Sequence, residues 1–256
     1  MIPRKQSATH ERFVAAMDNI EHIVTKAEYL EKKTVAIELI KKMSVGKCSY
    51  AWSGGKDSIA LQIVCKEANV HDCVLGMTNL EYPKFLQWIT DHMPHGLTVL
   101  SNGWDLEWLA KNQHMIFPQT SRTASVWFKG VQHAAQDKYC KKTKTTTMFM
   151  GRRLIDGNYC GKGFYYKSKG ITKVSPIADW SHETVLACLY YEGKATDLPP
   201  FYRWPRGYRC GTHSWPARQW CTSINDGWRE VYGIDYTIVI EAASKIDSAK
   251  KFLDSI

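Results

Sequence analysis

The sequence has no apolar run of the roughly 20 residues that a helix needs to cross a bilayer. Its N-terminal stretch also lacks the apolar core of a secretory signal peptide. These two absences argue against an integral membrane protein or a secreted protein. We therefore expect a cytoplasmic location and no membrane partner. The hydrophobic share of 44% and the charged share of 23% are typical of a globular domain.

Cysteine is scarce, because eight residues in a chain of 256 are too few for a disulfide-stabilised scaffold. No pair has the CxxC spacing that many metal and redox sites use. Four cysteines lie in apolar patterns and are predicted to be small buried hydrophobic residues: Cys48, Cys65, Cys73 and Cys188. The other four lie in polar or glycine-rich stretches and remain candidates for chemistry: Cys140, Cys160, Cys210 and Cys221.

Acidic residues are outnumbered, since 34 Lys and Arg stand against 25 Asp and Glu and give a formal net charge of +9. This balance suits an anionic partner such as a nucleotide, a sulfated metabolite or a nucleic acid. It fits a solvated basic surface equally well. The charge alone therefore does not select a partner.

Short apolar strands alternate with helical patterns over most of the chain. This alternation predicts an α/β protein with a doubly wound, mostly parallel sheet. The expected strands are residues 48–52, 74–77, 97–100, 146–150 and 171–177. The expected helices are residues 11–43, 56–65, 83–92 and 105–111, a helix capped by Ser125, and residues 181–191.

The strongest local signal for a binding site is the segment SGGKDS at residues 53–58, between an expected strand and an expected helix. Its two glycines permit backbone conformations in which successive N–H groups point into one concavity. The N-terminus of the following helix adds partial positive charge, which attracts anions. Lys56 adds a full charge, and Ser53 and Ser58 add hydroxyl donors. Asp57 suits an anion site only through a divalent cation such as Mg²⁺, which bridges carboxylates to phosphate oxygens.

The Walker pattern, GxxxxGK followed by Ser or Thr, is absent. This absence excludes a phosphate loop of the kinase or GTPase type. A plain glycine turn followed by a helix cap is the ordinary alternative for residues 53–58. The combination of six suitable residues between a strand and an amphipathic helix favours the phosphate site.

The segment SGGKDS resembles the signature of the PP-loop ATP pyrophosphatases, within the adenine nucleotide α-hydrolase superfamily. Four further segments follow in the order of the phosphoadenosine phosphosulfate (PAPS) reductase family. They are TNLEYP, GRR, SPIADW and a proline-containing turn, at residues 78–83, 151–153, 175–180 and 197–202. The resemblance covers roughly residues 45–213 and leaves the terminal helices outside.

The resemblance implies a HUP-type fold with a five-stranded, mostly parallel sheet. It also implies a nucleotide across the carboxyl edge, which is where open α/β sheets bind ligands in general. It assigns adenine nucleotide, with ATP and Mg²⁺ as cofactors, to the loop and to flanking main-chain groups: Ala51, Trp52, Ser53, Gly54, Gly55, Lys56, Asp57, Ser58, Met77 and Thr78. It assigns phosphate or sulfate to Gly151, Arg152 and Arg153, because a guanidinium fork fits tetrahedral anions. A solvated or helix-capping pair of arginines is the alternative.

Three regions follow from the resemblance and the composition. They are a helical N-terminal extension, the PP-loop nucleotide-binding domain, and a helical and irregular region on the side of the acceptor substrate: residues 1–45, 46–180 and 181–256. Within the last region, residues 194–222 lack any period, which is typical of a functional loop. Two closing helices are expected at about residues 223–232 and 239–254.

Two chemistries occur in the resembled family. ATP pyrophosphatases cleave ATP to AMP and pyrophosphate and activate an acceptor as an adenylate. Sulfonucleotide reductases attack the sulfur of PAPS or adenosine phosphosulfate with a cysteine in a motif that residues 209–213 partly match. Arg209 replaces the glutamate of that motif, and a long segment follows His213. The intact SGGKDS favours adenylation, with reduction through Cys210 as the alternative.

The expected catalytic residues are Lys56, Asp57, Arg152 and Cys210. Arg209 and His213 would favour the reactive thiolate of Cys210, and a plain packing role is the alternative. Cys210, His213 and Cys221 are also three potential ligands for zinc or an iron–sulfur cluster. Cys140 or Cys160 would supply a fourth ligand. The short-spaced cysteine pairs that are typical of such metal sites are missing. Asp57 is the candidate ligand for Mg²⁺.

Three segments interleave aromatic and basic residues: 138–144, 165–169 and 202–209. Stacking combined with phosphate contacts would suit a nucleic acid. A basic surface with aromatic rings packed under long side chains gives the same pattern. The acceptor therefore stays open, with sulfur transfer and nucleic-acid modification as candidates. A non-catalytic nucleotide-binding module is a third function that the loop allows, and the sequence leaves the oligomeric state open.

Overall fold

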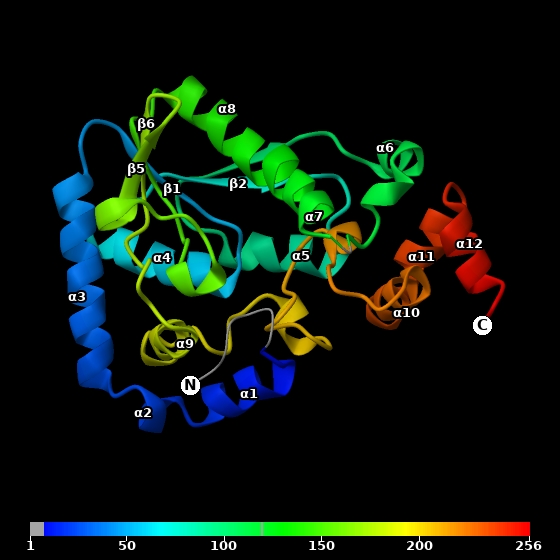
Figure 1. Cartoon of the computed structure of the whole chain (residues 1–256), viewed down its shortest axis with the longest axis horizontal. Coiled ribbons are helices and arrows are strands. Elements are labelled where there is room, and N and C mark those ends of the chain that lie inside the picture. The colour runs from blue at the N-terminus through cyan, green and yellow to red at the C-terminus, as the bar shows by residue number, and fades with distance from the viewer. Residues whose placement is uncertain (1–7, 119) are drawn as a thin grey trace.

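The computed structural model describes residues 8–118 and 120–256 and shows an α/β fold around one six-stranded sheet (Figure 1). The strand order is β3-β2-β1-β4-β6-β5. The strands are β1 Cys48–Ala51, β2 Cys73–Met77, β3 Leu97–Ser101, β4 Thr147–Phe149, β5 Tyr165–Ser168 and β6 Ile171–Val174. The predicted α/β class with a mostly parallel sheet is confirmed. Residues 1–7 of the predicted N-terminal extension lie outside the described residues.

The sheet has six strands, so the prediction of five is wrong. The pairs from β3 to β6 are parallel, whereas the additional strand β5 pairs antiparallel with β6. Lys169 and Gly170 connect these two strands with φ angles of +52° and +76°. Two positive φ angles in a two-residue turn match the twist of a hairpin. Lysine is not typical of such a turn, so the sequence pattern did not predict this hairpin.

Helices cover both faces of the sheet, and Figure 1 shows α8 above the sheet with α4 and α5 below it. Those of the first half of the chain are α1 His10–Asp18, α2 Ile20–Ile23, α3 Lys26–Met43, α4 Lys56–Glu67, α5 Pro83–His92 and α6 Leu106–Lys111. Short 3₁₀ turns are η1 Gln113–Met115, η3 Leu154–Asp156, η4 Lys162–Phe164, η5 Pro200–Arg203 and η6 Trp215–Ala217. Helix α8 contacts β2 and β3, whereas α4 packs against α3 and α9.

The single helix predicted for residues 11–43 is in fact divided into α1, α2 and α3. The last break occurs at Thr25, which forms a capping box with Glu28. The Thr25 hydroxyl accepts from the Glu28 N–H, and the Glu28 carboxylate accepts from the Thr25 N–H. This reciprocal pair satisfies free amides at the start of a new helix. The apolar pattern therefore continues past Thr25, although the helix is interrupted there.

The helix expected to start at Ser125 begins earlier and contains a π-helical turn. Thr120 is its N-cap, and its hydroxyl accepts from the Thr123 N–H at 3.2 Å. The run consists of α7 Ser121–Trp127, the π-helical turn η2 Phe128–His133 and α8 Ala134–Thr143. Turns of this kind are rare and often mark functional sites.

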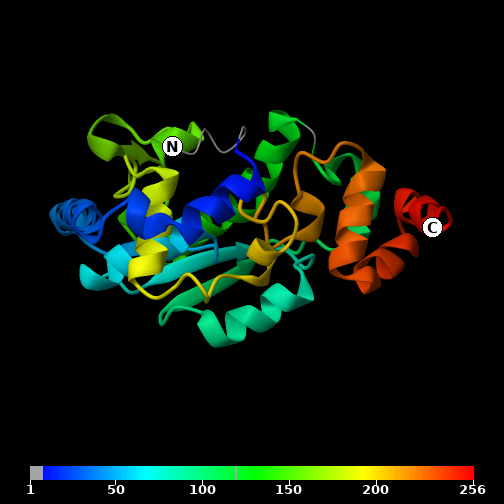
Figure 2. The same cartoon turned by 90° about the horizontal axis from the view of Figure 1, so that it is seen from below.

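The C-terminal region packs α9 His182–Tyr191 against α1, α2, α3 and α4. Its N-cap is Ser181, as predicted. Three closing helices are present where two were expected: α10 Ile224–Ile234, α11 Tyr236–Ala243 and α12 Asp247–Leu253. They lie together at one end of the molecule in both views (Figures 1 and 2). The predicted division into three regions stays a prediction.

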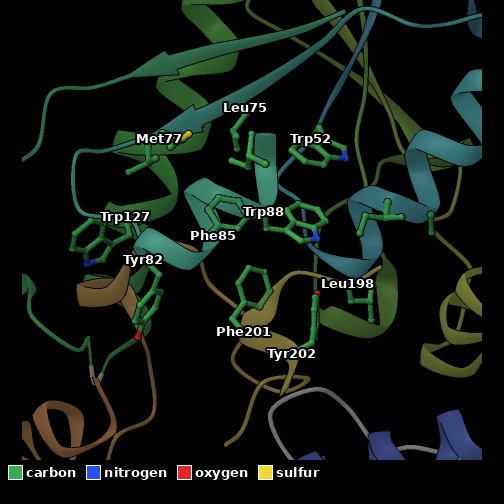
Figure 3. Packing of buried hydrophobic residues seen from close by; sticks show 14 of the residues in the cluster. Trp52, Leu75, Met77, Tyr82, Phe85, Trp88, Trp127, Leu198, Phe201 and Tyr202 are labelled. Atoms are coloured by element: carbon green, nitrogen blue, oxygen red, sulfur yellow. The ribbon is translucent and has the colours of Figure 1, made fainter. Parts of the chain in front are cut away.

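No described helix is at once long and apolar enough to cross a membrane. Below the sheet, aromatic side chains connect helix α5 with the irregular segment of residues 194–222. Phe85 of α5 lies 5.7 Å from Phe201, measured between ring centroids, and Trp88 stacks at 6.0 Å on Trp52. Figure 3 shows Phe201 and Tyr202 in this cluster with Trp88 and Trp52. This packing fixes the irregular segment next to residues 53–58.

Candidate active site

The loop of residues 53–58 runs from the end of β1 into the first turn of α4. Gly54 has a φ angle of +70°, and a Cβ atom there would meet the rings of Phe85 and Trp88 at 3.0 and 3.1 Å. Gly55 is the N-cap residue of α4 and has no side chain that could cap the helix. Both glycines are therefore needed, Gly54 for its backbone conformation and close packing, and Gly55 for an open helix end.

The two serines of the loop hold its shape. The Ser53 N–H donates to Oγ of Ser58 at 3.1 Å, and that hydroxyl donates to the Gly55 carbonyl at 2.8 Å. Oγ of Ser53 lies 3.3 Å from Oγ of Ser58 and 3.4 Å from the Gly55 nitrogen. These contacts close the segment into a compact turn at the positive end of α4, which is the geometry of an anion site.

A tyrosine from the irregular segment reaches the start of α4. The Lys56 N–H donates to the hydroxyl of Tyr202 at 2.6 Å, and Tyr202 is buried. Burial raises the pKa of this hydroxyl well above its ordinary value, and the carboxylate of Asp57 adds to the shift. The hydroxyl thus keeps its hydrogen, which remains available as a donor while the oxygen accepts from Lys56.

The side chain of Lys56 is buried between Asp57 and Phe13. It is 1% exposed, its ammonium lies 2.9 Å from both carboxylate oxygens of Asp57, and it lies 5.9 Å from the ring centroid of Phe13. Nε of Arg153 lies 3.0 Å from the same Asp57 carboxylate. Arg153 is fully buried and also pairs with Asp156 at 3.0 Å. These four residues form a balanced cluster of two cations and two anions beneath the loop.

A histidine completes this buried cluster. Nη2 of Arg153 lies 3.0 Å from Nδ1 of His182, which is fully buried. Burial, together with the nearby positive charges of Arg153 and Lys56, lowers the pKa of His182 to about 4. His182 is therefore neutral near pH 7, so Nδ1 accepts the hydrogen bond from the guanidinium. Within this cluster Lys56, Arg153 and His182 lie outside the cavity lining, whereas Asp57 and Asp156 line the cavity.

One cavity of about 620 Å³ opens above the loop. Ten of the residues predicted for the site line it: Ala51, Trp52, Ser53, Gly55, Asp57, Ser58, Gly151, Arg152, Cys210 and His213. Six others are placed outside its lining: Gly54, Lys56, Met77, Thr78, Arg153 and Cys221. The cavity therefore unites the loop, the end of β4 and the irregular segment. For Lys56 and Arg153, the structure shows a supporting position in place of direct contact with a ligand.

Arg152 is the predicted arginine that does face the cavity. It donates to the Tyr166 hydroxyl at 2.8 Å and to Nε2 of His133 at 2.9 Å. Burial lowers the pKa of His133, and the positive charge of Arg152 lowers it further. His133 is thus a neutral acceptor that orients the guanidinium. Gly151 allows this arrangement, because a Cβ atom there would come within 3.1 Å of the Asp57 carbonyl.

A buried carboxylate orients His213 at the cavity wall. Oε1 of Glu81 lies 3.3 Å from Nδ1 of His213 and also accepts from the Ser214 hydroxyl at 2.9 Å. The N–H and hydroxyl of Thr78 donate to the same oxygen at 2.8 and 2.9 Å. Glu81 keeps a lowered pKa although burial opposes this, because His213 and the other donors stabilise the carboxylate. The ring of His213 stacks on Phe85 with centroids 4.9 Å apart.

The structure does not bring the predicted metal ligands together. The described ranges contain no group of three or more His, Cys, Asp or Glu side chains placed to hold a metal ion. Sγ of Cys210 donates to the Gln219 carbonyl at 3.4 Å, and Sγ of Cys221 accepts from Arg206 at 3.4 Å. Burial raises the pKa of the Cys140 thiol to about 11 and also raises that of Cys160. The residues thus do not fit zinc or an iron–sulfur cluster in this arrangement.

Several residues of the cavity were not singled out from the sequence. Asp156 and the helical residues Gln132, His133 and Gln136 are among them. Asp156 and Asp57 are the two acidic side chains of the lining. The helical residues are spaced three and four apart, which is the one signal that could have grouped them on a single face. Only the fold reveals that this face turns toward the loop.

A scan against protein-family models found no match, and a search of curated proteins found none either. Among solved structures, the chain is similar to a PAPS reductase from Candida auris in a phosphate complex. The identity is 12%, the TM-score is 0.48, and the match covers 66% of this chain and 88% of the reductase.

It is also similar to a U34-tRNA thiolase from Methanococcus maripaludis that carries a 4Fe–4S cluster. There the identity is 13%, the TM-score is 0.46, and the match covers 90% of this chain and 80% of the thiolase.

Proposed function

We propose that the chain is an ATP pyrophosphatase of the PP-loop kind, which cleaves ATP to AMP and pyrophosphate and adenylates an acceptor. The observation that supports this proposal most is the shared cavity of about 620 Å³. It joins the turn of residues 53–58, the open end of α4 and the guanidinium of Arg152. These groups all favour a polyanion at one place.

The proposed step is a displacement at the α-phosphorus. An oxygen of the acceptor forms a bond to that phosphorus while the bond to the bridging oxygen breaks, and pyrophosphate leaves with the electron pair. The partial positive charge at the N-terminus of α4, the Tyr202 hydroxyl and Arg152 would stabilise the charge that builds on the departing phosphates. Mg²⁺ carried on the phosphates would add charge neutralisation, and Asp57 and Asp156 are the carboxylates of the cavity that would hold it.

The acceptor side of the cavity is formed by the irregular segment and by helix η2. Its basic lining residues include Lys129 and Arg209. Phe128 and Trp220 also line it and are 46% and 40% exposed. Basic groups beside exposed rings suit an acceptor with phosphates and flat bases. We therefore favour nucleic-acid modification, with sulfur transfer as one form of it, over a small uncharged acceptor.

Sulfonucleotide reduction remains a second candidate because Cys210 lines the same cavity. Cys210 is 8% exposed, so its thiol is close to the ligand space without being at the surface. A third candidate is a nucleotide-binding module without catalysis. That candidate requires only the loop and the cavity. The contact between Glu81 and His213 has no role in it.

Product analysis separates the three candidates. The protein is incubated with Mg²⁺ and ATP, with and without transfer RNA or single-stranded DNA, and AMP, ADP and pyrophosphate are resolved. AMP with pyrophosphate supports the proposed cleavage, whereas ADP contradicts it. Arg152→Gln should reduce product formation at least tenfold, and Arg122→Gln, at an exposed position outside the cavity, is the matched control.

The role of Cys210 is tested in the same assay. A Cys210→Ser protein that still releases pyrophosphate from ATP has no essential thiol in that half-reaction. PAPS with a thiol reductant tests the reductase, since sulfite release by the wild-type protein and not by Cys210→Ser would support reduction. Binding of ATP without any product from any acceptor would favour the non-catalytic module.

A further inference from the structure

A polar stripe faces the cavity from the side of the sheet opposite α4. Lys129, Gln132, His133 and Gln136 all line the cavity and stand at positions i, i+3, i+4 and i+7 on the run from η2 into α8. Such spacing places side chains on one face of a helical segment. Figure 1 shows α8 above the sheet, whereas α4 with its loop lies below. The stripe therefore forms a second wall of the cavity, separate from the loop of residues 53–58.

The floor of this part of the cavity is apolar and flat. Ala51, Val74, Gly76 and Met150 line it, and Ala51 pairs with Val74 in neighbouring strands. A Cβ atom on Gly76 would lie 2.5 Å from the Val131 carbonyl oxygen, so the helix rests directly on β2. These residues give this part of the cavity an apolar floor, which suits an aromatic base.

Gln136 is the buried polar group at this floor. It is 6% exposed, and its Oε1 atom has no hydrogen-bond partner within residues 8–118 and 120–256. A buried acceptor without a partner is uncommon and calls for an explanation. The amide offers an acceptor and two donors, and a half-turn of the amide group exchanges which end meets the cavity. A ligand edge that carries a donor beside an acceptor would satisfy it.

We infer that Gln136 hydrogen-bonds the edge of the adenine base of the bound nucleotide, which rests on Ala51, Val74 and Met150. The Oε1 atom would accept from the 6-amino group while Nε2 donates to a neighbouring ring nitrogen, a pairing that glutamine commonly makes with adenine. Ala51 and Ser53 line the same cavity, so a base on this floor lies near phosphates at the loop. The inference rests on the proposed function, since it takes ATP as the ligand.

Three ligands separate base recognition from phosphate binding in calorimetric titrations. ATP carries the 6-amino group, purine riboside 5′-triphosphate lacks it, and inorganic tripolyphosphate lacks the whole nucleoside. The wild-type protein should bind ATP about tenfold more tightly than purine riboside 5′-triphosphate. Gln136→Leu should bind ATP and purine riboside 5′-triphosphate with about equal affinity, while its affinity for tripolyphosphate stays unchanged.

Gln87→Leu is the matched control, since Gln87 is an exposed glutamine in α5. Gln136→Met is a second variant of similar length, which replaces Gln136→Leu if that protein does not fold. The inference is overturned if ATP binds and the Gln136 variants keep the wild-type preference for it. Failure of the wild-type protein to bind ATP would overturn both this inference and the proposed function, whereas binding of ATP without cleavage would contradict the function alone.

Discussion

Nε of Arg153 lies 3.0 Å from Oδ1 of Asp57, so a residue that follows β4 holds the first turn of α4. The two residues follow the carboxyl ends of β4 and β1, which are neighbouring strands in the sheet. Gly151 permits the approach, because a Cβ atom there would stand 3.1 Å from the Asp57 carbonyl. The shape of residues 53–58 therefore depends on the GRR segment as much as on its own glycines.

Removal of the Arg153 charge should destabilise the whole domain. Arg153→Met leaves the half-buried carboxylates of Asp57 and Asp156 with fewer partners, and loss of one member of a buried ion pair costs up to about 3–5 kcal/mol. The free energy of unfolding, measured with urea, is expected to fall by that amount. Arg122→Met, at an exposed position, should change it by less than about 0.5 kcal/mol. Equal losses in both variants would show that Arg153 does not hold the loop.

His182 should make the protein less stable in mild acid. Its pKa is about 4 in the folded protein and 6.5 in the unfolded chain, so the unfolded chain binds a proton first as the pH falls. Stability is full above pH 6.5 and declines between pH 6.5 and 4. Between pH 7.5 and 5 the expected loss from this group is about 2 kcal/mol.

The variant His182→Gln keeps an acceptor for Arg153 and cannot take up that proton. Its free energy of unfolding should therefore lack this part of the pH dependence, whereas the exposed control His22→Gln should retain it. Urea titrations at both pH values measure the difference. A wild-type slope that persists in His182→Gln would assign the acid sensitivity to other groups.

Local patterns predicted the loop well because its glycines, serines and flanking elements are adjacent in the sequence. They did not predict the direction of the Lys56 side chain, which is set by Asp57 and by Arg153 across the sheet. They also missed the hairpin at Lys169 and Gly170, because lysine is not typical of a turn position with a positive φ angle. The Arg153–Asp57 contact joins residues that are distant in the sequence, and no local pattern predicts it.

The same reason explains the second wall of the cavity. Gln136 lies about 80 residues from the loop in the chain, and only the crossover from β3 through α8 to β4 brings it to the sheet edge. The expected adenosine contacts at Met77 and Thr78 were placed by the resemblance alone. In the structure those residues lie outside the cavity lining, and the Thr78 hydroxyl donates to the carboxylate of Glu81.

Gly54→Ala should test the crowding around the loop. A side chain at a positive φ angle costs about 1–2 kcal/mol, and the rings of Phe85 and Trp88 at 3.0 and 3.1 Å add steric strain. Gly103 has a φ angle of +78° with nothing within 4 Å, so Gly103→Ala carries the backbone cost alone. Thermal unfolding should show a clearly larger loss for Gly54→Ala. Equal losses would mean that the rings move aside freely.

Tyr202→Phe should weaken nucleotide binding, because the hydroxyl that accepts from the Lys56 N–H can donate its own hydrogen to a phosphate oxygen. Loss of a hydrogen bond to a charged group corresponds to about a tenfold lower affinity. Titrations with ATP and with pyrophosphate should show the same factor for both ligands, since the contact is to phosphate. Tyr208→Phe, in the same irregular segment, should bind as the wild-type protein does. Tighter binding by Tyr202→Phe would instead mean that the tyrosine hydroxyl occupies the position that the phosphate needs and must leave before ATP binds.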